Sequence, residues 1–400
     1  MKFRNVLHLD LDTFFVSVER LRNSQLEGKP LIIGGKNGRG VVASCSYETR
    51  RFGVHSAMPM RMALQLCPQA TVISGDMEAY SNSSREITEI ISEEAPLFEK
   101  SSIDEFYLDV SGMDKFFGCL QWSHELRSRI IKETGLPISF GLSINKTVSK
   151  VATGEAKPNN EKYIPAGKER PFLAPLSIRK IPMIGDKTYQ MLRMRGVEKI
   201  ATLSQMPVQY LQQLLGKNGT AIWKKANGID NSPVIPYSEA KSISTEQTFQ
   251  QDTIDIVRLK QILTGMTEKL AFTLRDEERL TSCVTVKIRY SNFDTETRQL
   301  RIPYTASDHV LMRTVLDLFD RLYQRRMLLR LVGVRFSALV HGSHQISLFD
   351  ETPEQVNLYQ AMDKIRRRHG MDMVMRASSM QVYNRRERIN DLHTLKYASR

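Results

Sequence analysis

A chain of 400 residues, 41% of them hydrophobic, can bury several cores, and the lack of low-complexity runs excludes a wholly disordered protein. Lys and Arg outnumber Asp and Glu by 57 to 44, which leaves a formal net charge of +13. That excess favours a polyanionic partner, nucleic acid before an anionic membrane surface, although a basic protein without such a partner stays an alternative.

Cysteine usage and hydropathy indicate the compartment. The four cysteines are far apart and form no C-x₂-C pair, which argues against a zinc site. Arg4, Asp10 and Asp12 lie near the start of the chain, unlike in a signal peptide, and no apolar run approaches the ~20 residues of a membrane span. We therefore expect a reduced, cytoplasmic protein that does not insert into a membrane.

The first predicted element is a strand at the start of the segment VLHLDLDTFFVSVE. Its residues alternate, so that the leucines at positions 7, 9 and 11 share one face while the other face carries His8, Asp10 and Asp12. We expect the leucine face to pack on helices and the carboxylates to lie on an open face of a sheet.

From Pro30 to Pro165 short strands and helices alternate. A Gly-rich stretch and the basic segment YETRRFGV come first, followed by a small helix at MRMALQLCP. A longer helix within GDMEAYSNSSREITEIISEEAP leads to a strand within KSSIDEFYLDVSG, and the helix WSHELRSRIIKETG precedes the strand PISFGLSIN.

A different pattern follows Pro165. Two pairs of short helices, each with a glycine between the helices, are predicted in IRKIPMIGDKTYQMLRMRGVEKIATL and LQQLLGKNGTAIWKKANGID. The stretch NSPVIPYSEAKSIS has two prolines and little periodicity, which is typical of an interdomain linker.

Beyond this linker the predicted order is strand, helix, strand, strand, helix, strand, which makes a small two-layer α/β unit. The first of its helices is predicted from Ile254 to Arg275. Its strands carry five basic residues, so we expect one face of the sheet to be basic. These residues are Lys287, Arg289, Arg298, Arg301 and Arg335.

Two adjacent carboxylates, Asp104 and Glu105, stand where the strand pattern of KSSIDEFYLDVSG begins. Burying neighbouring like charges is costly unless a positive charge lies between them. A strand pair can bring both beside Asp10, and three carboxylates without His or Cys ligands favour Mg²⁺ or Mn²⁺. Because carboxylates are common on protein surfaces, an ordinary acidic surface stays an alternative at this point.

The backbone around this pair needs a special geometry. A regular pleat would point the two carboxylates to opposite faces, so both can reach one site only if the strand starts or bulges there. Ser101 and Ser102, just before them, suit a turn. We therefore expect the pair at the mouth of a hairpin beside Asp10, with a regular pleat only from about Phe106.

Three further residues are suited to binding a triphosphate. Tyr47 and Arg50 are three positions apart in YETRRFGV and lie on one side if that segment is helical. Lys157, in GEAKPNN, precedes a proline that ends local regular structure. The cations would neutralise phosphate oxygens while the tyrosine hydroxyl donates a hydrogen bond. A solvated basic loop is the alternative.

Six motifs stand in the order and spacing of one known family. They are HLDLDTFFVSVE, YETRRFGVHSAMP, SIDEFYLDV, GLSINKTVSKVATGEAKPN, IPMIG and KSISTEQTF. From about residue 4 to about residue 350 the chain resembles the Y-family DNA polymerases, and it is most similar to their DinB branch, DNA polymerase IV.

The resemblance implies a multidomain α/β (α+β) fold with a polymerase palm, small fingers, a helical helix-hairpin-helix thumb and a β-α-β-β-α-β little finger. It also implies domain boundaries. The expected domains are a catalytic palm at 1–19 and 76–166, fingers at 20–75, a thumb at 167–233, a linker at 234–241, a little finger at 242–342 and a C-terminal tail at 343–400.

The resemblance further implies a catalytic metal site. Asp10, Asp104 and Glu105 match the family's catalytic metal ligands, with the carbonyl group of Leu11 as a backbone ligand. Two Mg²⁺ ions are the expected cofactors, and Mn²⁺ can replace them. Asp12 matches an acidic position of the family that we do not expect to be a direct ligand.

The nucleotide site follows in the same way. Tyr47, Arg50 and Lys157 match the family's triphosphate-binding residues. Phe15 matches the bulky residue beneath the sugar, where a ribose 2′-hydroxyl would clash, so deoxynucleotides are the expected substrates. Phe14, which we count with it at the nucleotide site, is expected by alternation to face the core.

The segment IPMIGDKT resembles a helix-hairpin-helix. Backbone N–H groups near Gly185, with Lys187 beside them, would meet a DNA phosphate, because helix N-termini favour anions. A weaker second copy is centred on Gly216 and Gly219. Without the neighbouring motifs, an ordinary helical hairpin with a glycine cap would be the default interpretation.

The segment QISLFD resembles the peptide that docks bacterial polymerases on the sliding clamp, the β subunit of the replicase. Leu348 and Phe349 would fill an apolar pocket while Gln345 makes polar contacts. The residues beyond it contain VNLYQAMDKIRRRHG, which can form a basic amphipathic helix. A solvated tail and an accessory contact to DNA or a partner are both open for this helix.

The resemblance, together with these features, implies a template-directed, low-fidelity translesion DNA polymerase, which we expect to act as a monomer in damage tolerance and repair. Its partners would be primer-template DNA, deoxynucleoside triphosphates and the clamp. The primer 3′-hydroxyl would attack the α-phosphate, and pyrophosphate would leave. A non-catalytic scaffold would require a missing carboxylate, and a cyclase-type enzyme would leave the DNA-binding and clamp motifs unexplained.

Overall fold

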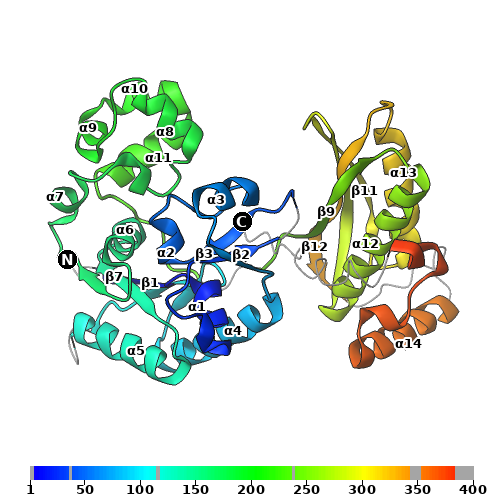
Figure 1. The fold of residues 1–400 in the computed structure, drawn as a ribbon, viewed down its shortest axis with the longest axis horizontal. Coiled ribbons are helices and arrows are strands. Elements are labelled where there is room, and N and C mark those ends of the chain that lie inside the picture. Colours follow the sequence, from blue (N-terminus) through cyan, green and yellow to red (C-terminus); the bar gives the residue numbers. More distant parts are fainter. Residues whose placement is uncertain (1–3, 36–37, 114–117, 237–238, 343–352, 383–400) are drawn as a thin grey trace. The chain divides into compact units, whose positions relative to one another are not determined.

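The computed structural model describes residues 4–35, 38–113, 118–236, 239–342 and 353–382. The chain divides between Tyr237 and Ser238 into two units, each with hydrophobic cores of its own (Figure 1). The division falls within residues 234–241, where the sequence predicts a linker. Among the described residues, none of the helices combines the length and apolar character that crossing a bilayer requires.

The first unit is built on a five-stranded sheet with the strand order β5-β6-β1-β7-β8. β1 (Val6–Leu11) lies in the middle and pairs antiparallel with both of its neighbours. The other strands are β5 (Phe98–Lys100), β6 (Glu105–Asp109), β7 (Ile138–Ser143) and β8 (Glu161–Tyr163).

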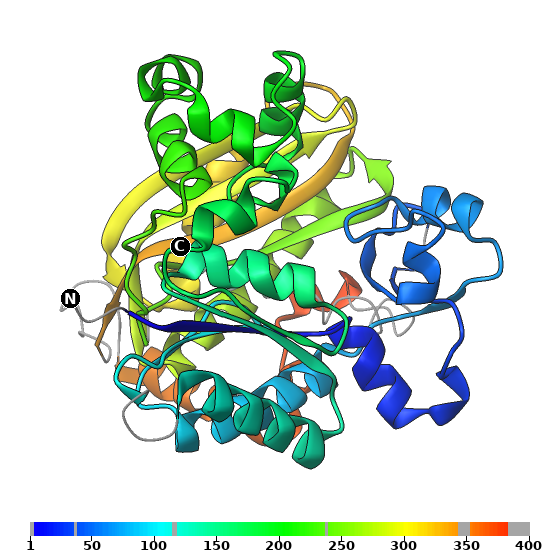
Figure 2. The same ribbon diagram turned by 90° about the vertical axis from the view of Figure 1, so that its left-hand side faces the viewer.

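Helices cover both faces of this sheet (Figure 2). α4 (Met77–Glu94) and α5 (Cys119–Thr134) pack on the face that carries the β1 leucines, as predicted, and α6 (Lys146–Ala156) covers the opposite face. The expectation that the polar face of β1 is open is therefore wrong at His8. That side chain is fully buried, and its Nδ1 atom lies 2.8 Å from the hydroxyl oxygen of Thr153 in α6.

α6 lies so close to the sheet because Gly141 of β7 has no side chain. A Cβ atom at this position would lie 2.2 Å from the carbonyl oxygen of Ser149 and 2.5 Å from the backbone nitrogen of Thr153. Any other residue would push the helix away, since the backbones already touch. The close approach brings the lysines of α6 over the polar side of β1 and β6.

A second, smaller sheet of the first unit has the strand order β3-β2-β4 and its own apolar core. It is inserted between α1 (Phe14–Arg22) and α4. The basic segment YETRRFGV begins with one helical turn, which was the condition for placing its tyrosine and arginine on one side. The elements are η1 (Ser24–Leu26), β2 (Leu31–Gly34), β3 (Val42–Cys45), α2 (Tyr47–Arg50), α3 (Met60–Leu66) and β4 (Thr71–Ile73).

Short helices follow β8, and their shared core includes side chains from the outer face of α6. Four of them form the two pairs that the sequence predicts. The elements are α7 (Glu169–Leu173), η3 (Ile178–Lys180), α8 (Asp186–Arg193), α9 (Ile200–Gln205), α10 (Val208–Leu215) and α11 (Lys217–Ala226).

The chain beyond α11 is bound to the first unit before it leaves it. Lys146 of α6 donates hydrogen bonds to both carboxylate oxygens of Glu99, at 2.7 and 2.6 Å, and to the carbonyl oxygen of Pro233 at 3.3 Å. The N–H of Ile235 donates to the same carboxylate at 2.8 Å, and Val234 is buried. The first residues of the predicted linker are therefore held in place.

The second unit has the predicted order β9-α12-β10-β11-α13-β12. Its sheet has the strand order β11-β10-β12-β9, and the two helices pack on one face of it. The elements are β9 (Ser242–Thr253), α12 (Ile256–Asp276), β10 (Arg279–Tyr290), β11 (Thr295–Thr305), α13 (Asp308–Leu322) and β12 (Leu329–His341).

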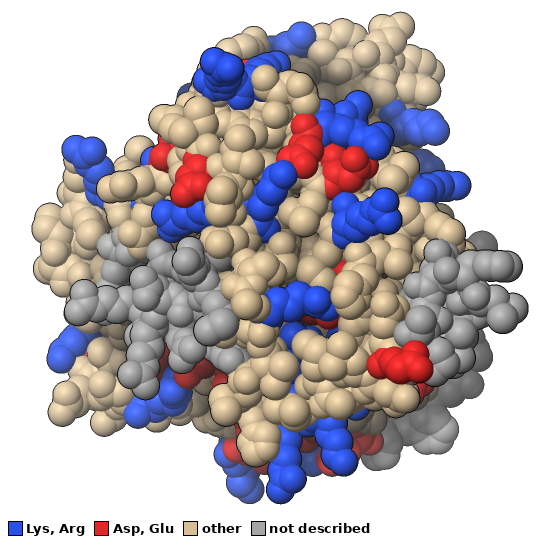
Figure 3. Space-filling model, turned by 90° about the vertical axis from the view of Figure 1, so that its right-hand side faces the viewer, with Lys and Arg blue, Asp and Glu red and all other residues tan. Residues whose placement is uncertain are grey.

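The C-terminal segment packs on the helical side of this unit. It consists of α14 (Pro353–His369), η4 (Met371–Met373) and η5 (Ala377–Val382), with η5 against α12. Arg275 of α12 donates to both carboxylate oxygens of Asp363, at 2.6 and 2.9 Å. The described part of VNLYQAMDKIRRRHG is thus not a freely solvated tail. Over the described part of the face in Figure 3, basic side chains are interspersed with acidic ones.

Candidate active site

The sheet register brings the three predicted carboxylates together at one end of β1 and β6. Asp10 lies opposite Glu105 in one strand pair and opposite Ser139 in the other. The N–H of Leu11 donates to the carbonyl oxygen of Asp104 at 3.0 Å, which places this residue beside the same strand end. Three acidic positions that are distant in the sequence are therefore neighbours in the sheet.

The acidic pair lies at the mouth of a hairpin, as predicted. β5 ends at Lys100 and β6 begins at Glu105. The hydroxyl group of Ser102 accepts from the N–H groups of Asp104 and Glu105, at 3.3 and 3.1 Å, and donates to Oδ1 of Asp104 at 2.5 Å. This turn keeps Asp104 outside the pleat, so strand alternation does not force the two carboxylates onto opposite faces.

Two lysines pair with two of the three carboxylates, Glu105 and Asp10. Lys150 of α6 donates to both carboxylate oxygens of Glu105, at 2.6 and 2.5 Å. Lys157, just after α6, donates to Oδ1 of Asp10 and, at 3.3 Å, to the carbonyl oxygen of Leu11. Burial nevertheless raises the pKa of Asp10 to about 7, because it outweighs the lowering effect of Lys157.

The donor set fits a hard divalent cation. It offers three carboxylates and a backbone carbonyl, the oxygen ligands that Mg²⁺ prefers. Within the described ranges, however, no three acidic, His or Cys side chains are arranged to hold an ion as they stand. Lys150 and Lys157 engage Glu105 and Asp10 instead, and Asp104 is turned to Ser102. Metal binding therefore requires these side chains to be released.

Asp12 has a structural role in this arrangement. Its side chain is 1% exposed, and it accepts hydrogen bonds from the hydroxyl of Ser139 at 2.8 Å and the N–H of Asn159 at 2.6 Å. The hydroxyl of Tyr47 donates to its other oxygen at 3.3 Å. These bonds join β1, β7, α2 and the loop that follows α6, which agrees with the expectation that Asp12 is not a metal ligand.

Two of the three predicted triphosphate-binding residues, Tyr47 and Lys157, contact this buried carboxylate. In the single turn of α2, the guanidinium of Arg50 lies 5.0 Å from the centre of the Tyr47 ring, and Arg50 is exposed. The ammonium of Lys157 lies 3.6 Å from Asp12, on the oxygen that Tyr47 contacts. Burial raises the pKa of Tyr47, so its hydroxyl remains a hydrogen-bond donor at physiological pH.

The two phenylalanines at the start of α1 have different surroundings. Phe14 is 3% exposed and belongs to the core of the first unit, as expected, although it begins a helix and does not continue an alternating strand. Phe15 is half-buried, and its ring stacks on that of Tyr80 with centroids 4.2 Å apart and planes inclined by 11°. Of the two rings, the one at position 15 is therefore the one that can face a ligand.

Known proteins share this chain's sequence along most of its length. Residues 9–154 match the impB/mucB/samB family, and residues 240–348 match the C-terminal domain of that family. A DNA polymerase IV of Dehalococcoides mccartyi is 39% identical over 94% of this chain and 97% of its own length. A DNA polymerase IV of Methanoculleus marisnigri is 38% identical over 87% of this chain and 98% of its own. The chain belongs to the DNA polymerase IV family.

Solved structures of Y-family polymerases have the same fold. A Y-family DNA polymerase chimera of Dbh and Dpo4 superposes with a TM-score of 0.74 at 25% identity, covering 84% of this chain and all of its own. DinB from Sulfolobus solfataricus gives a TM-score of 0.59 at 25% identity, covering 83% of this chain and 98% of its own. The predicted Y-family fold is confirmed.

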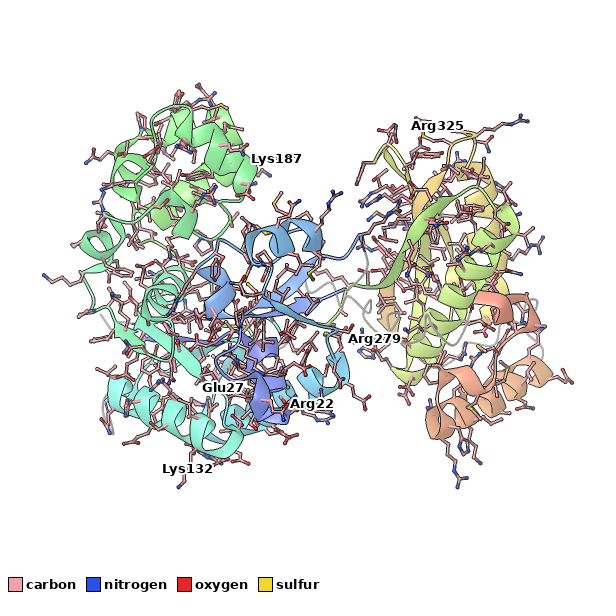
Figure 4. The ribbon with its side chains drawn as sticks, viewed as in Figure 1. Arg22, Glu27, Lys132, Lys187, Arg279 and Arg325 are labelled. Atoms are coloured by element: carbon pink, nitrogen blue, oxygen red, sulfur yellow. The ribbon has the colours of Figure 1, made fainter. Side chains whose placement is uncertain are left out.

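The positions expected to bind DNA in this Y-family polymerase differ in their surroundings. Gly185 precedes the exposed start of α8, and Lys187 projects outward from that helix (Figure 4). Gly216 joins α10 to α11 with a φ of 63°, which favours glycine. Gly219 is buried, and a Cβ atom there would lie 2.0 Å from the carbonyl oxygen of Leu211. This glycine therefore serves helix packing.

Four of the five basic strand residues predicted for the second unit lie on the sheet face away from α12 and α13, and one of them, Lys287, is paired there with Glu246 at 2.8 Å. Alternation along β10 turns residues 283, 285, 287 and 289 to that face, and cross-strand pairing extends it to β11 and β12. The basic side chains that share it are Lys287, Arg289, Arg301 and Arg335.

Arg298 departs from the expectation of one basic face. It lies opposite Val286, a core residue, and so belongs to the helical side of the sheet. Its guanidinium donates to the carbonyl oxygen of Arg321 in α13 at 2.8 Å. The reason is strand alternation, which separates it from the other four.

Two residues next to the site were missed by sequence reasoning. Lys150 was detectable, because it precedes Lys157, the residue that directly follows α6, by seven positions, which is about two helical turns. Tyr80 gave no local signal, since its contact with Phe15 depends on how α1 meets α4. The predicted clamp residues Gln345, Leu348 and Phe349 lie outside the described residues.

Proposed function

We propose that this chain is a template-directed DNA polymerase that extends a primer 3′-hydroxyl with deoxynucleotides and copies damaged templates with low fidelity. The observation that carries the proposal is the meeting of Asp10, Asp104 and Glu105 at a hairpin mouth, in a member of the DNA polymerase IV family. Clustered carboxylates of this kind are the usual ligands of the metals that promote phosphoryl transfer.

In this proposal the three carboxylates and the carbonyl of Leu11 hold two Mg²⁺ ions, for which Mn²⁺ can substitute. When bound, the ions lower the pKa of the attacking hydroxyl and stabilise the charge of the leaving pyrophosphate. The protein itself must supply ionised carboxylate oxygens as ligands for these ions. Asp10, whose pKa is about 7, loses its proton, and Lys157 and Lys150 release their carboxylates.

The released Lys157 then joins Tyr47 and Arg50 in binding the triphosphate. The support for this step is that Asp12 contacts both the tyrosine and the lysine, and that Arg50 lies beside the Tyr47 ring. Ammonium and guanidinium groups would neutralise the phosphate oxygens, and the tyrosine hydroxyl would donate to one of them. Phe15 would lie beneath the deoxyribose and exclude a 2′-hydroxyl.

DNA would be held by contacts that ignore its sequence. The start of α8 at Gly185, with Lys187, and the turn at Gly216 offer backbone N–H groups and positive charge to phosphates. The basic sheet face of the second unit would add salt-dependent affinity. Gly219 would support the second of these turns through packing.

The structural elements map onto polymerase domains in the same proposal. The five-stranded sheet with α4 to α6 would be the palm, the three-stranded sheet the fingers, α7 to α11 the thumb and the second unit the little finger. We propose that the enzyme works as a cytoplasmic monomer, recruited by the sliding clamp through Gln345, Leu348 and Phe349. Deleting residues 345–350 should lower clamp-stimulated synthesis and spare clamp-free synthesis.

Primer extension on a defined template tests the proposal. Wild type, Asp104→Asn and the matched control Asp109→Asn, at the far end of β6, are compared in Mg²⁺. We expect wild type and the control to extend the primer, and Asp104→Asn to lose activity by a factor on the order of 100.

Each alternative predicts a different result. Equal extension by wild type and Asp104→Asn would contradict the metal-site assignment. DNA binding without extension by any of the three proteins would favour a non-catalytic scaffold, and a cyclic nucleotide formed without a primer would favour cyclase chemistry. Extension past a panel of template adducts then measures lesion bypass.

A further inference from the structure

We propose that Glu19 is a positioning residue that fixes, through Tyr80, the orientation of the Phe15 ring and thereby sets the discrimination against ribonucleotides. The inference rests on the proposed role of Phe15 beneath the sugar. It deepens that role, because it gives a function to a buried carboxylate that lies behind Phe15. The gate is Phe15 in its proposed role of excluding a 2′-hydroxyl.

The ring of Tyr80 supports the ring of Phe15 from behind. Tyr80, in α4, is 0% exposed, whereas Phe15 is partly exposed. The two rings are nearly parallel, with centroids 4.2 Å apart. A stacked ring cannot tilt without losing contact with its partner, so the plane of Tyr80 restricts the plane of Phe15.

Glu19 fixes the other end of the tyrosine. The hydroxyl of Tyr80 donates to Oε1 of Glu19 at 2.7 Å. Glu19 lies four residues after Phe15 on α1, so the two side chains project from the same side of that helix. α1 therefore holds Tyr80 at two points, the ring through Phe15 and the hydroxyl through Glu19.

The surroundings keep this hydrogen bond in one form. Burial raises the pKa of Tyr80, so the hydroxyl keeps its proton and remains the donor. Arg22, labelled in Figure 4, lies 3.7 Å from Glu19 and 2.9 Å from Asp76, and so compensates the buried negative charge. A charged acceptor gives a stronger hydrogen bond than a neutral one.

Gly75 encloses the tyrosine ring at its edge. A Cβ atom at position 75 would lie 3.3 Å from Cε2 of Tyr80, 3.4 Å from its hydroxyl oxygen and 3.2 Å from a methyl group of Ile33. An added methyl group must therefore displace the ring or its neighbours. Gly75→Ala thus perturbs the position of the ring without removing a polar group.

The test measures kcat/KM for a deoxynucleotide and for the ribonucleotide of the same base, in the full-length enzyme. Tyr80→Phe removes the donor, Glu19→Met removes the acceptor, and the matched control Glu19→Gln keeps an acceptor oxygen. We expect the deoxy-to-ribo ratio to fall roughly fivefold in the first two variants, the effect of losing one hydrogen bond, and to stay near the wild-type value in Glu19→Gln.

The double variant and the melting temperature separate positioning from general destabilisation. Tyr80→Phe combined with Glu19→Met should lower the ratio no further than either single variant, because both remove the same bond. A loss of folding alone lowers both kcat/KM values together and leaves their ratio unchanged. If Tyr80→Phe does not fold, Gly75→Ala supplies the measurement, with the same expected fall in the ratio.

Phe15→Ala distinguishes this inference from the function on which it rests. If Phe15→Ala gains ribonucleotide insertion while Tyr80→Phe and Glu19→Met keep the wild-type ratio, the role of Glu19 is overturned. The proposed role of Phe15 in excluding ribonucleotides is then retained. If Phe15→Ala gains no ribonucleotide insertion, the gate assignment fails, and the role of Glu19 fails with it.

Discussion

Asp10 is the residue at which proton binding and the proposed metal binding compete. Burial raises its pKa to about 7 in the metal-free protein. An acid whose pKa is raised on folding stabilises the fold while it is protonated. That contribution is complete below the pKa of the unfolded chain and is lost as the pH rises through about 7. A cation that requires the ionised carboxylate must displace this proton below that pH.

The affinity of the nucleotide-free protein for Mn²⁺ should therefore depend on pH. We expect it to rise about tenfold per pH unit up to pH 7 and to level off above it, because one proton is displaced per ion bound at this carboxylate. Titration calorimetry measures this, with Asp10→Asn as the variant that should lose the dependence. A flat affinity on both sides of pH 7 would show that Asp10 does not gate metal binding.

At the residue scale, sequence reasoning succeeded where the signal was local. The hairpin mouth at Asp104 and Glu105 followed from two serines before a strand, and the structure confirms it. The engagement of Glu105 by Lys150 was not predicted, because it depends on how closely a helix approaches a sheet. The distance between α6 and the sheet is set by tertiary packing, which the local sequence does not show.

At the element scale, Gly141 determines where α6 lies. Gly141→Ala should lower the free energy of unfolding by about 1–3 kcal/mol, because the added methyl group overlaps the backbone of α6. It should also lower polymerase activity, since the helix leads directly to Lys157, a proposed triphosphate-binding residue. Urea denaturation measures the first effect.

Gly154, on the same helix, is the matched control. Nothing lies within 4 Å of a Cβ atom at this position. Gly154→Ala should therefore raise stability by up to about 1 kcal/mol, the difference in helix propensity. Equal stability of wild type and Gly141→Ala would mean that α6 can shift without cost.

The alternation of β1 correctly assigned its leucine face but not what covers the other face. The close approach of the covering helix α6 depends on Gly141, which lies in β7. The sequence of β1 alone does not show that β7 is its neighbour, so this effect could not be foreseen. Arg298 shows the same limit, because a list of basic strand residues does not say which side of the sheet each one takes. The order of the helices and strands could be predicted from the sequence. The side of the sheet that each residue takes, and the helix that covers it, could be assigned only once the strand pairing was known.

At the scale of the whole molecule, the C-terminal segment is an integral part of the second unit. The side chains of Arg275 and Asp363 are 9% and 6% exposed. Removing one partner of a buried ion pair costs about 3–5 kcal/mol when the other charge is left unpaired. Arg275, however, also donates to Oδ1 of Asp308 at 2.6 Å and keeps that partner. Asp363→Asn should therefore destabilise the second unit by less than that, about 1–3 kcal/mol, measured as faster hydrogen exchange in α12 and α14.

Asp276→Asn provides the control for this prediction. Asp276 pairs with Arg367 at 2.7 Å, but the two side chains are 47% and 55% exposed. Its loss should change stability by less than about 1 kcal/mol, as for other solvated pairs. Equal protection of wild type and Asp363→Asn would show that α14 is held by other contacts.

This docking could not be predicted from the sequence. The sequence motifs that carried the family resemblance end by about residue 350, and the partners Arg275 and Asp363 are separated by 88 positions. A basic amphipathic pattern shows that a helix has an apolar face and a charged face. It does not identify the surface of the protein on which the apolar face packs. The family fold was predictable because several motifs agreed at once.

The lysines along and just beyond α6 give the molecule a mechanical property. Lys146 bonds to Glu99 and to the carbonyl of Pro233, where the chain leaves the first unit. Lys150 and Lys157 hold Glu105 and Asp10. Lys146 and Lys150 are about one turn apart on α6, so the same helix contacts the departing chain and the carboxylate of Glu105. A force that displaces the linker would therefore be transmitted through α6 to Glu105, one of the proposed catalytic carboxylates.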